Sequence, residues 1–381
     1  MTLDLICRVI DNYGDIAVVW RLAQALVQDG GAGLRVRVLL DDWDALRALN
    51  PALEAGRDRQ ELRCAGGTVT VLRAPADAAG FDAADVVVEA FGAPTPDAWM
   101  RAFLAAAALD PGHPRILVHL EYLTAEAWSE AYHLLPSPLG HPGVQRHFFV
   151  PGFRPHTGGL VFTDPPAPLA HRGPEDWLMT LFSYEHDFTR FWDGLCDFLD
   201  ERGESARVVV FAGRSRAGAL ASWAKVQASR PKPPVITVVD QNFVDQDTYT
   251  ALLAAADFNV VRGEESWVQA VLAGRPFLWQ AYLQEGGHQL VKVEAFLEVW
   301  GGRFEAEGEA GREVFSRVAK EFRAFNRRNA DSVAETPTEG YRVFWENRSL
   351  LERVGRAWAV ELRKNAKLSR KLLEFLEKVR V

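Results

Sequence analysis

Two aspartates near the N-terminus stand at a spacing that suits shared chemistry. Asp11 and Asp15 lie four residues apart, after an apolar run at residues 3–10 that predicts a buried strand. A helical pattern follows, with one apolar face formed by Val19, Leu22, Ala23 and Leu26. Open α/β sheets bind ligands where strands end beside helix starts, so both carboxylates are candidates for orienting a substrate and accepting a proton. The alternative is structural: Asp15 would cap the helix and Asp11 would close an Asx turn.

A second group of polar residues follows another apolar strand pattern. Arg262 and Gly263 form the predicted turn, and Glu264, Glu265 and Ser266 open the predicted helix. Backbone N–H groups at a helix start, together with a serine hydroxyl, suit a phosphate or diphosphate. The glutamates would repel an anion unless they point elsewhere, and they could instead grip sugar hydroxyls. The structural alternative is a helix whose first turn carries acids that favour its dipole.

Aromatic side chains stand at two further predicted strand ends. Phe182 and Tyr184 follow one strand pattern, and Phe243, Gln246 and Tyr249 follow another. Because parallel strands end at the same edge of a sheet, these side chains would lie on the edge that carries the second polar group. Flat rings there could sandwich a nucleobase, and Gln246 could read its polar edge. Each ring alone would also suit a core, but two groups on one edge predict a nucleotide pocket.

The composition carries no metal or membrane signature. The 381 residues exceed a usual single core, which predicts two domains. A formal net charge of −8 disfavours broad binding to nucleic acid or anionic membranes. The three cysteines, and the histidines His141, His147 and His156, lack metal-ligand spacing. Because the chain shows no signal-peptide pattern and no apolar run that could span a bilayer, we expect a cytoplasmic protein without a metal site.

Strand and helix patterns alternate along two successive parts of the chain. The strands predicted in the first part are 34–40, 68–72, 85–91 and 116–120, with a helix at 97–109. Those predicted in the second part are 177–182, 208–212, 235–239 and 258–261, with helices at 187–200 and 217–228. A proline- and glycine-rich segment, residues 136–168, separates two α/β halves with mostly parallel sheets. The C-terminal segment 348–381 is helical and basic, and would either dock an acidic partner or form a solvated helix face.

Several strings of the sequence resemble one family closely. The chain is similar to the EarP family, protein-arginine rhamnosyltransferases, in RVIDNYGDIAVVWRLA, HLEYLTAEAW, LPSP, PGF, TGGL, LFSYE, VRGEESWVQA and GRPFLW. The resemblance runs through nearly the whole chain, and the first and the RGE-centred strings are the most specific. It implies an α/β chain with the GT-B glycosyltransferase fold, two Rossmann-like domains facing a central cleft. The acceptor-binding domain would be residues 1–170, completed by the C-terminal helix 355–381, and the nucleotide-sugar-binding domain would be residues 171–354.

The resemblance also implies an activity. The enzyme would move L-rhamnose from dTDP-β-L-rhamnose to an arginine side chain of elongation factor P, with inversion and without a metal or other cofactor. Modified elongation factor P would then support translation of polyproline stretches. The catalytic residues that the family's motifs imply are Asp11, Asp15 and Glu264. The implied donor contacts are Phe182, Tyr184, Phe243, Gln246, Tyr249, Arg262, Glu265, Ser266 and Tyr282. Glu265 stands where the family commonly has aspartate, so its carboxylate reaches further.

Arginine is a difficult acceptor, and this gives the two aspartates distinct roles. A guanidinium is a poor nucleophile because its lone pairs are delocalised and its pKa is above ~12. One carboxylate can orient it through charge-assisted hydrogen bonds while the other accepts a proton. We assign Asp15 as the base and Asp11 as the orienting partner, although the residues alone leave their order open.

Two other readings of the sequence remain open. The chain could be a GT-B nucleotide-sugar transferase with a different acceptor, or a non-catalytic nucleotide-sugar-binding protein. The second of these predicts donor binding that is indifferent to the loss of the aspartates. A nicotinamide-dependent enzyme is disfavoured because the only glycine-rich string of suitable type, residues 30–33, precedes a strand instead of following one.

Overall fold

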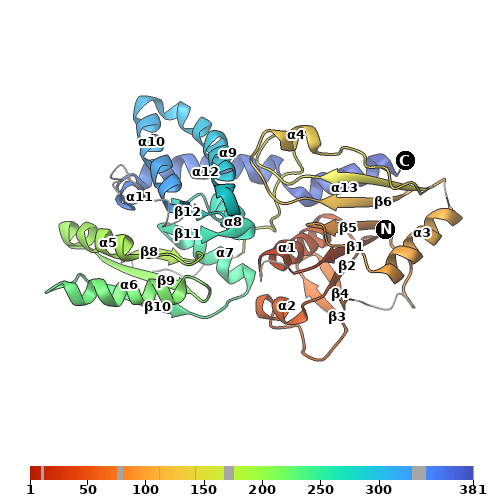
Figure 1. Ribbon diagram of the computed structural model, residues 1–381, viewed down its shortest axis with the longest axis horizontal. Helices are drawn as coiled ribbons and strands as arrows, with labels where there is room; N and C mark the ends of the chain where they lie inside the picture. Colours follow the sequence, from red (N-terminus) through yellow and green to blue (C-terminus); the bar gives the residue numbers. More distant parts are fainter. Residues whose placement is uncertain are drawn as a thin grey trace. The chain divides into compact units, whose positions relative to one another are not determined.

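The chain forms two compact α/β units. The computed structural model describes residues 1–9, 13–74, 80–110, 112–141, 143–166, 176–327 and 340–380, without the side chains at 176 and 285. Unit 1 consists of Met1–Asp164 and Lys364–Val381, and unit 2 of Pro165–Arg363 (Figure 1). The boundary near the C-terminus falls inside one helix, α12, so the last helix of the chain belongs to unit 1.

Unit 1 is built on a seven-stranded sheet with the order β3-β4-β2-β1-β5-β6-β7. Six strands are parallel and β3 pairs antiparallel with β4 at one edge. The strands are β1 (Thr2–Cys7), β2 (Arg35–Leu40), β3 (Arg59–Cys64), β4 (Gly67–Arg73), β5 (Val86–Ala90), β6 (Arg115–Leu120) and β7 (Val144–Phe149). Because β2 and β5 flank β1, the chain reverses its direction of travel across the sheet between β1 and β5, the position where doubly wound folds bind ligands.

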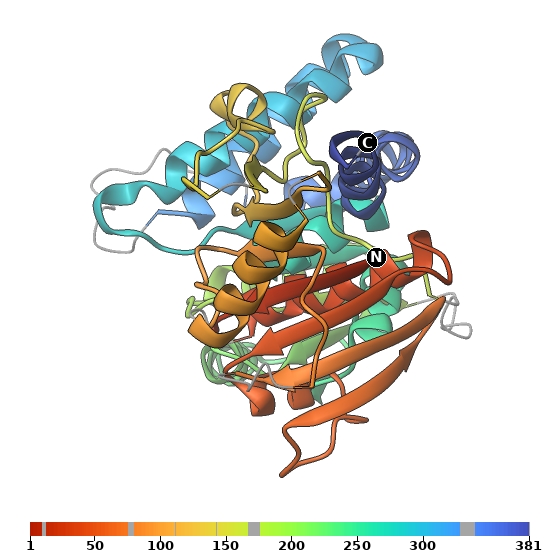
Figure 2. The same cartoon turned by 90° about the vertical axis from the view of Figure 1, so that its right-hand side faces the viewer.

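Helices cover both faces of this sheet, which explains why its central strands are rich in apolar residues. One face packs on α1 (Gly14–Asp29) and α13 (Leu368–Val379), and the other on α3 (Asp97–Leu109). Side chains along β1 alternate accordingly, with Leu3 and Leu5 in the first core and Ile6 in the second. Two short helices, α2 (Trp43–Leu49) and α4 (Trp128–Tyr132), complete the unit. Figure 2 shows the twisted strands of this sheet, in red and orange.

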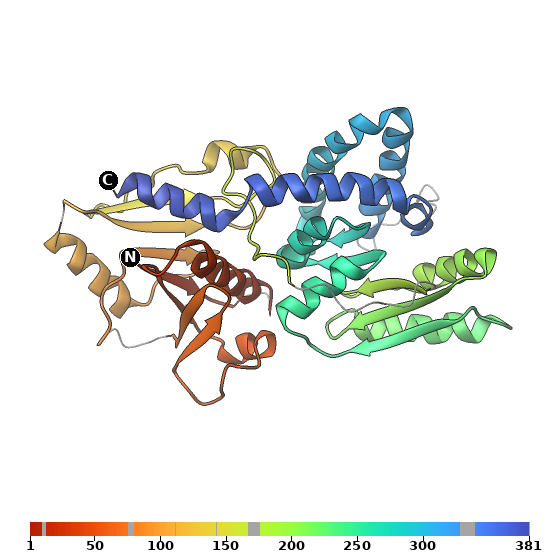
Figure 3. The same ribbon diagram turned by 180° about the vertical axis from the view of Figure 1, so that it is seen from behind.

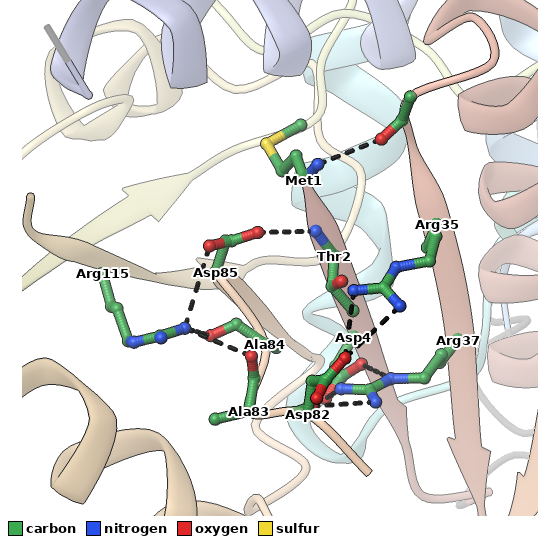
Figure 4. Close-up of polar contacts among 11 residues, drawn as sticks. Met1, Thr2, Asp4, Arg35, Arg37, Asp82, Ala83, Ala84, Asp85 and Arg115 are labelled. Carbon is green, nitrogen blue, oxygen red and sulfur yellow. Dashed lines mark hydrogen bonds and ion pairs between the residues drawn. The ribbon is translucent and has the colours of Figure 1, made fainter.

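A buried ion pair lies inside the unit 1 sheet, on the half away from the carboxyl ends of the strands. Arg37 of β2 donates two hydrogen bonds to Asp4 of β1, at 2.6 and 2.9 Å (Figure 4). Its guanidinium lies 4.8 Å from the ring centre of Trp99. Burial raises the pKa of Asp4, and the hydrogen bonds and charge of Arg37 oppose that rise. The neighbouring cavity, about 470 Å³, is lined by further arginines that also face carboxylates, including Arg35 beside Asp82.

Unit 2 contains a five-stranded parallel sheet with the order β10-β9-β8-β11-β12. Its strands are β8 (Asp176–Leu181), β9 (Ser205–Phe211), β10 (Ile236–Gln241), β11 (Phe258–Arg262) and β12 (Phe277–Gln280). Its helices are α5 (Thr189–Arg202), α6 (Arg216–Ser229), α7 (Gln246–Ala255), α8 (Gly263–Ala273), α9 (Gln289–Gly301), α10 (Gly308–Phe325), α11 (Arg342–Glu346) and α12 (Arg348–Asn365), with short 3₁₀ turns at Glu285–Gly287 and Gly302–Glu307. The direction of travel reverses between β8 and β11, so this sheet has its own ligand-binding edge.

Most predicted elements are present, and the exceptions have physical reasons. The first strand ends at Cys7, earlier than its apolar run suggested. Strands β3 and β7 were not predicted, because polar residues interrupt both sequences and β7 lies inside the proline- and glycine-rich segment. The single C-terminal helical segment is two helices, α12 and α13. They are separated where Leu160 pairs with the backbone on either side of Lys367 (Figure 3).

The basic residues at this break already have partners within unit 1. Lys367 is buried, and its ammonium lies 3.0 Å from a carboxylate oxygen of Asp29 on α1 and 3.3 Å from Asp164. Arg370 pairs with the same Asp29 at 3.1 Å, and Ser369 donates a hydrogen bond to it at 2.6 Å. These contacts fasten the last helix to α1, so this part of the basic segment has a structural role.

Candidate active site

The best-defined polar site lies at the carboxyl edge of the unit 2 sheet. Phe182 follows β8, and its backbone N–H donates to the carbonyl of Val260 in β11 at 2.9 Å. Arg262 ends β11 beside it. The two strands flank the reversal point of the sheet, where parallel α/β folds leave space for a ligand. The topology thus brings together two groups of residues that lie about eighty positions apart in the sequence.

Arg262 is a buried cation held against two aromatic rings. Its guanidinium carbon lies 4.8 Å from the ring centre of Phe182 and 4.6 Å from that of Tyr184. The side chain is only 7% exposed, and its Nε has no hydrogen-bond partner among the residues that the structure describes. A buried donor without a partner is costly, and a guanidinium is the group best suited to bidentate contact with phosphate. The geometry suits an anion that enters this edge.

The turn after Arg262 exposes the start of α8. Gly263 has a φ of +65°, which favours glycine, and a Cβ at this position would lie 3.6 Å from the hydroxyl of Tyr184. The indole N–H of Trp279 donates to the carbonyl of Gly263 at 2.9 Å, and the Trp279 ring stacks on Trp267 at 3.7 Å. No side chain caps the helix, and the N-terminus of a helix is a favourable place for an anion.

The first turn of α8 carries the predicted acids and serine. Ser266 is buried, while Glu264 and Glu265 are half-buried. A carboxylate oxygen of Glu264 lies 3.7 Å from the ammonium of Lys292 on α9. Both readings from the sequence, sugar contact and dipole-favourable acid, fit this position.

Aromatic rings extend the site on either side of Arg262. Tyr184 is buried, and its backbone N–H donates to the side-chain oxygen of Gln280 at 2.9 Å. Its ring packs edge-on against the exposed ring of Tyr282, with 5.6 Å between ring centres. Phe182 packs edge-on against Tyr249 at 5.8 Å. Four of the predicted donor residues, at 182, 184, 249 and 282, therefore lie in one set of contacts centred on the arginine.

The remaining two predicted residues lie at the end of β10. Phe243 is 41% exposed, in the loop before α7, and Gln246 is the buried first residue of α7. Asp245 caps this helix, because its carboxylate accepts the backbone N–H of Thr248 at 2.9 Å. Gln246 stands one turn before Tyr249, so both side chains come from the same helix end.

Sequence reasoning missed residues that support this site from below. Gln280 holds the backbone of Tyr184 from the end of β12. Gly213 follows β9, and a Cβ there would lie 3.1 Å from the Phe182 ring, so glycine leaves that ring its place. A polar residue at a strand end was a usable signal for Gln280, whereas nothing local marked Gly213.

Unit 1 presents Asp15 at the corresponding edge of its own sheet. Asp15 is 4% exposed in the first turn of α1. The N-cap of α1 is Tyr13, and no side chain caps the helix. The structural alternative for Asp15, that it serves as the helix cap, is therefore wrong. Asp11 lies outside the described residues.

A second carboxylate, Asp41, accompanies Asp15 at this edge. Burial raises the pKa of the Cys7 thiol, and the charges of Asp15 and Asp41 raise it further. Asp41 follows β2, and its carboxylate accepts the backbone N–H of Val9 at 3.0 Å. The thiol stays protonated and unreactive between them. Asp41 was not predicted, although its place after an apolar strand was an available signal.

Two features are absent from the described part of the chain. The described residues include no group of three or more His, Cys, Asp and Glu side chains placed to hold a metal ion. Among the same residues, no helix is long and apolar enough to cross a membrane.

Comparison with known proteins identifies the family. A family model described as Elongation-Factor P (EF-P) rhamnosyltransferase EarP matches residues 3–377. The chain belongs to the EarP family. It is 36% identical over 322 residues to the protein-arginine rhamnosyltransferase of Pseudomonas putida, covering 78% of this chain and 80% of the relative. The enzyme of the same name from Neisseria meningitidis is 32% identical over 327 residues, with 80% of each chain covered.

The fold agrees with a solved EarP structure. A structure described as the basis for EarP-mediated arginine glycosylation of translation elongation factor EF-P superposes with a TM-score of 0.53 and 23% identity, covering 99% of each chain. The predicted fold class, GT-B with two Rossmann-like units, is confirmed. The predicted family and the prediction of a glycosyltransferase enzyme are confirmed as well.

Proposed function

We propose that this EarP-family enzyme transfers L-rhamnose from dTDP-β-L-rhamnose to an arginine side chain of elongation factor P (EF-P). The transfer inverts the anomeric carbon, requires no metal, and prepares EF-P for translation of polyproline stretches. The observation that carries the proposal is Arg262, buried against Phe182 and Tyr184 at the open start of α8. This arrangement provides a cationic binding site for the diphosphate of a sugar nucleotide.

The donor is held by groups on both sides of that diphosphate-binding site. The Arg262 guanidinium and the first N–H groups of α8 contact the diphosphate, and the Ser266 hydroxyl adds a hydrogen bond. The nucleobase lies against the rings of Phe182, Phe243 and Tyr249, while Gln246 reads the polar edge of thymine. Glu265 and the rings of Tyr184 and Tyr282 contribute the remaining donor contacts.

The diphosphate leaves with additional negative charge, and the protein stabilises that charge without a metal. The diphosphate-binding site contains a fixed cation and aligned backbone dipoles. They stabilise a developing anion without having to reorient during the reaction. Glu264, which faces Lys292 at 3.7 Å, steadies the positive charge that develops at the anomeric carbon. Each group acts on charge that appears only as the sugar–phosphate bond breaks.

The acceptor is activated by unit 1. Asp15 takes a proton from the arginine guanidinium as its nitrogen attacks the anomeric carbon, and Asp11 orients the guanidinium. The attack comes from the face opposite the diphosphate, so a β-linked donor gives an α-linked product. The burial of Asp15 fits a base that works away from bulk water.

The test is a reaction of purified enzyme, dTDP-β-L-rhamnose and EF-P from the same organism, followed by intact mass and by NMR of the product. We expect EF-P to gain one deoxyhexosyl residue with an α-linkage, and the gain to disappear when its acceptor arginine is replaced by lysine. Donor binding without a gain on EF-P would point to another acceptor, and failure to bind the donor would refute the donor assignment. Cytoplasmic localisation, where EF-P acts, remains a prediction from the sequence.

A further inference from the structure

The unit 1 sheet has an unusual turn at its reversal point. After β5 the chain turns through Phe91 and Gly92, whose φ angles are +57° and +74°, and the N–H of Ala93 donates to the carbonyl of Ala90 at 2.9 Å. Two successive positive φ angles are typical of a type I′ turn, which is usually built from glycine, asparagine or aspartate. A phenylalanine in this conformation is strained, and such strain is concentrated at functional sites.

The strained turn positions an aromatic stack. The Phe91 ring lies on the ring of Tyr122, with 4.5 Å between ring centres and 16° between planes. Tyr122 follows β6, and the turn is tied to the end of that strand because the N–H of Phe91 donates to the carbonyl of Leu120 at 2.8 Å. Phe91 is buried and Tyr122 is 38% exposed. One face of the Tyr122 ring therefore packs on the buried Phe91 ring, while the tyrosine remains accessible to solvent.

This stack belongs to the same sheet edge as Asp15. Strand β5 is the hydrogen-bonded neighbour of β1, with Glu89 opposite Ile6, so the two strands end side by side. Asp15 opens the helix that follows β1, and Tyr122 follows the strand on the other side of β5. The edge therefore presents a buried carboxylate and an exposed aromatic face in succession.

The segment that begins at Tyr122 is rich in exposed apolar side chains, and the rings of Trp128 and Tyr132 pack edge-on with 5.8 Å between their centres. Five of the eleven exposed large apolar side chains among the described residues fall between positions 122 and 135: Tyr122, Trp128, Tyr132, Leu134 and Leu135. Half-buried glutamates alternate with them at positions 121, 126 and 130. Aromatic faces with adjoining carboxylates are the surroundings that a guanidinium prefers, since it stacks on the ring and pairs with the acid.

We propose that the aromatic segment 122–135 is the docking face for the acceptor protein, and that its arginine side chain stacks on Tyr122. This rests on the proposed function, because the acceptor's positive charge is what the glutamates complement. Tyr122 binds the guanidinium plane next to Asp15, Phe91 is a positioning residue that holds the tyrosine, and Trp128 and Tyr132 contact the surrounding surface of the acceptor.

The test compares Tyr122→Leu, Tyr122→Phe and the control Leu109→Ser, an exposed apolar residue on α3 of the same unit. We expect Tyr122→Leu to lower kcat/KM for EF-P about tenfold while the Kd for dTDP and the thermal unfolding temperature stay unchanged. Tyr122→Phe should retain wild-type kinetics because it keeps the ring, and Leu109→Ser should change nothing.

The positioning role of Phe91 has its own variant. Asparagine tolerates positive φ, so Phe91→Asn keeps the turn while it removes the ring. We expect its KM for EF-P to rise with kcat less affected and dTDP binding intact. Wild-type kinetics for Tyr122→Leu, in an enzyme that modifies EF-P normally, would overturn this inference and leave the proposed function standing. An inactive wild-type enzyme would instead count against the proposed function.

Discussion

The guanidinium of Arg262 lies 4.6 Å from the ring centre of Tyr184, and a second arginine, Arg214, lies 5.6 Å from the same ring. The two differ in their surroundings. Arg214 is 47% exposed and pairs with Glu185 at 2.8 Å, which lowers the pKa of that carboxyl. Arg262 is buried, with one donor unused among the described residues. Arg262 is therefore the proposed ligand-binding cation, whereas Arg214 is engaged in a partly exposed ion pair.

Because of this difference, we expect the same substitution to weaken donor binding at Arg262 and to leave it nearly unchanged at Arg214. Arg262→Met should weaken dTDP binding by about 2 kcal/mol, roughly thirtyfold in Kd, because charge-assisted hydrogen bonds to the diphosphate are lost. Arg214→Met should change the Kd no more than about threefold, since an exposed ion pair contributes little. Calorimetric titration with dTDP measures both, and equal losses in the two variants would contradict the assignment of Arg262.

The glycine after Arg262 can be tested against a glycine of nearly identical conformation. Gly263 and Gly203 both have φ of +65°, and nothing lies near a Cβ built on Gly203. Each change to alanine should cost about 1–2 kcal/mol of unfolding free energy, because both force a side chain into the left-handed region. Only Gly263→Ala should also weaken dTDP binding. A similar loss of binding in Gly203→Ala would show that global destabilisation, and not the helix start, is responsible.

Replacing Asp15 should affect transfer of the sugar but not binding of the donor. Asp15→Asn should abolish rhamnosylation of EF-P, since an amide cannot accept the proton, while dTDP binding and the unfolding temperature remain close to wild type. Asp44→Asn, on the exposed face of α2, serves as the matched control and should retain full activity. Turnover by Asp15→Asn at the wild-type rate would remove this residue from the mechanism.

Two half-buried histidines, His133 and His186, predict a loss of stability in weak acid. Burial lowers the pKa of both His133 and His186 from 6.5 to about 4, with additional effects from nearby charges. Below pH 6.5 these histidines take up protons in the unfolded chain, whereas in the folded chain they do so only near pH 4. The free energy of unfolding therefore decreases as the pH falls from 6.5 to 4. Each histidine should remove about 2 kcal/mol of unfolding free energy between pH 7 and pH 5.

Denaturant unfolding at these two pH values checks the effect. In the folded protein, Nδ1 of His133 accepts the backbone N–H of Val150 at 3.2 Å, so His133→Gln keeps a possible acceptor while it removes the titration. We expect the variant to lose less stability than wild type between pH 7 and pH 5. The exposed His113→Gln should behave like wild type, and an identical pH dependence in all three proteins would contradict the prediction.

Residues that act locally were predictable from the sequence, and residues that act across strands were not. The turn at Arg262 and Gly263 followed from an apolar strand, a glycine and a helical pattern in succession, and the structure has it in place. Phe91 gave no such signal, because a phenylalanine after an apolar strand looks like core until the positive φ is seen. Gln280 stands at a strand end, which marks it as a candidate, but its contact with Tyr184 could not be predicted because the two residues are ninety-six positions apart.

The same distinction applies to the fold. Strands rich in β-branched and aliphatic residues, such as β2, were predicted, while β7, with Arg146 and His147 in its centre, lacked that pattern. The residues at the carboxyl edge of the unit 2 sheet were predicted as a set because neighbouring parallel strands end at the same edge. The Asp41 carboxylate beside Asp15 was not, because its proximity depends on how β1 and β2 pair.

The intact mass of EF-P after reaction in the presence of a metal chelator tests the central claim most directly. Wild-type enzyme, EDTA, dTDP-β-L-rhamnose and EF-P should give complete addition of one deoxyhexosyl residue, and Asp15→Asn should give none although it binds dTDP. If addition occurs only after a divalent cation is added back, the proposal that Arg262 stabilises the diphosphate without a metal would be contradicted. No addition by a wild-type enzyme that binds the donor would contradict EF-P as the acceptor.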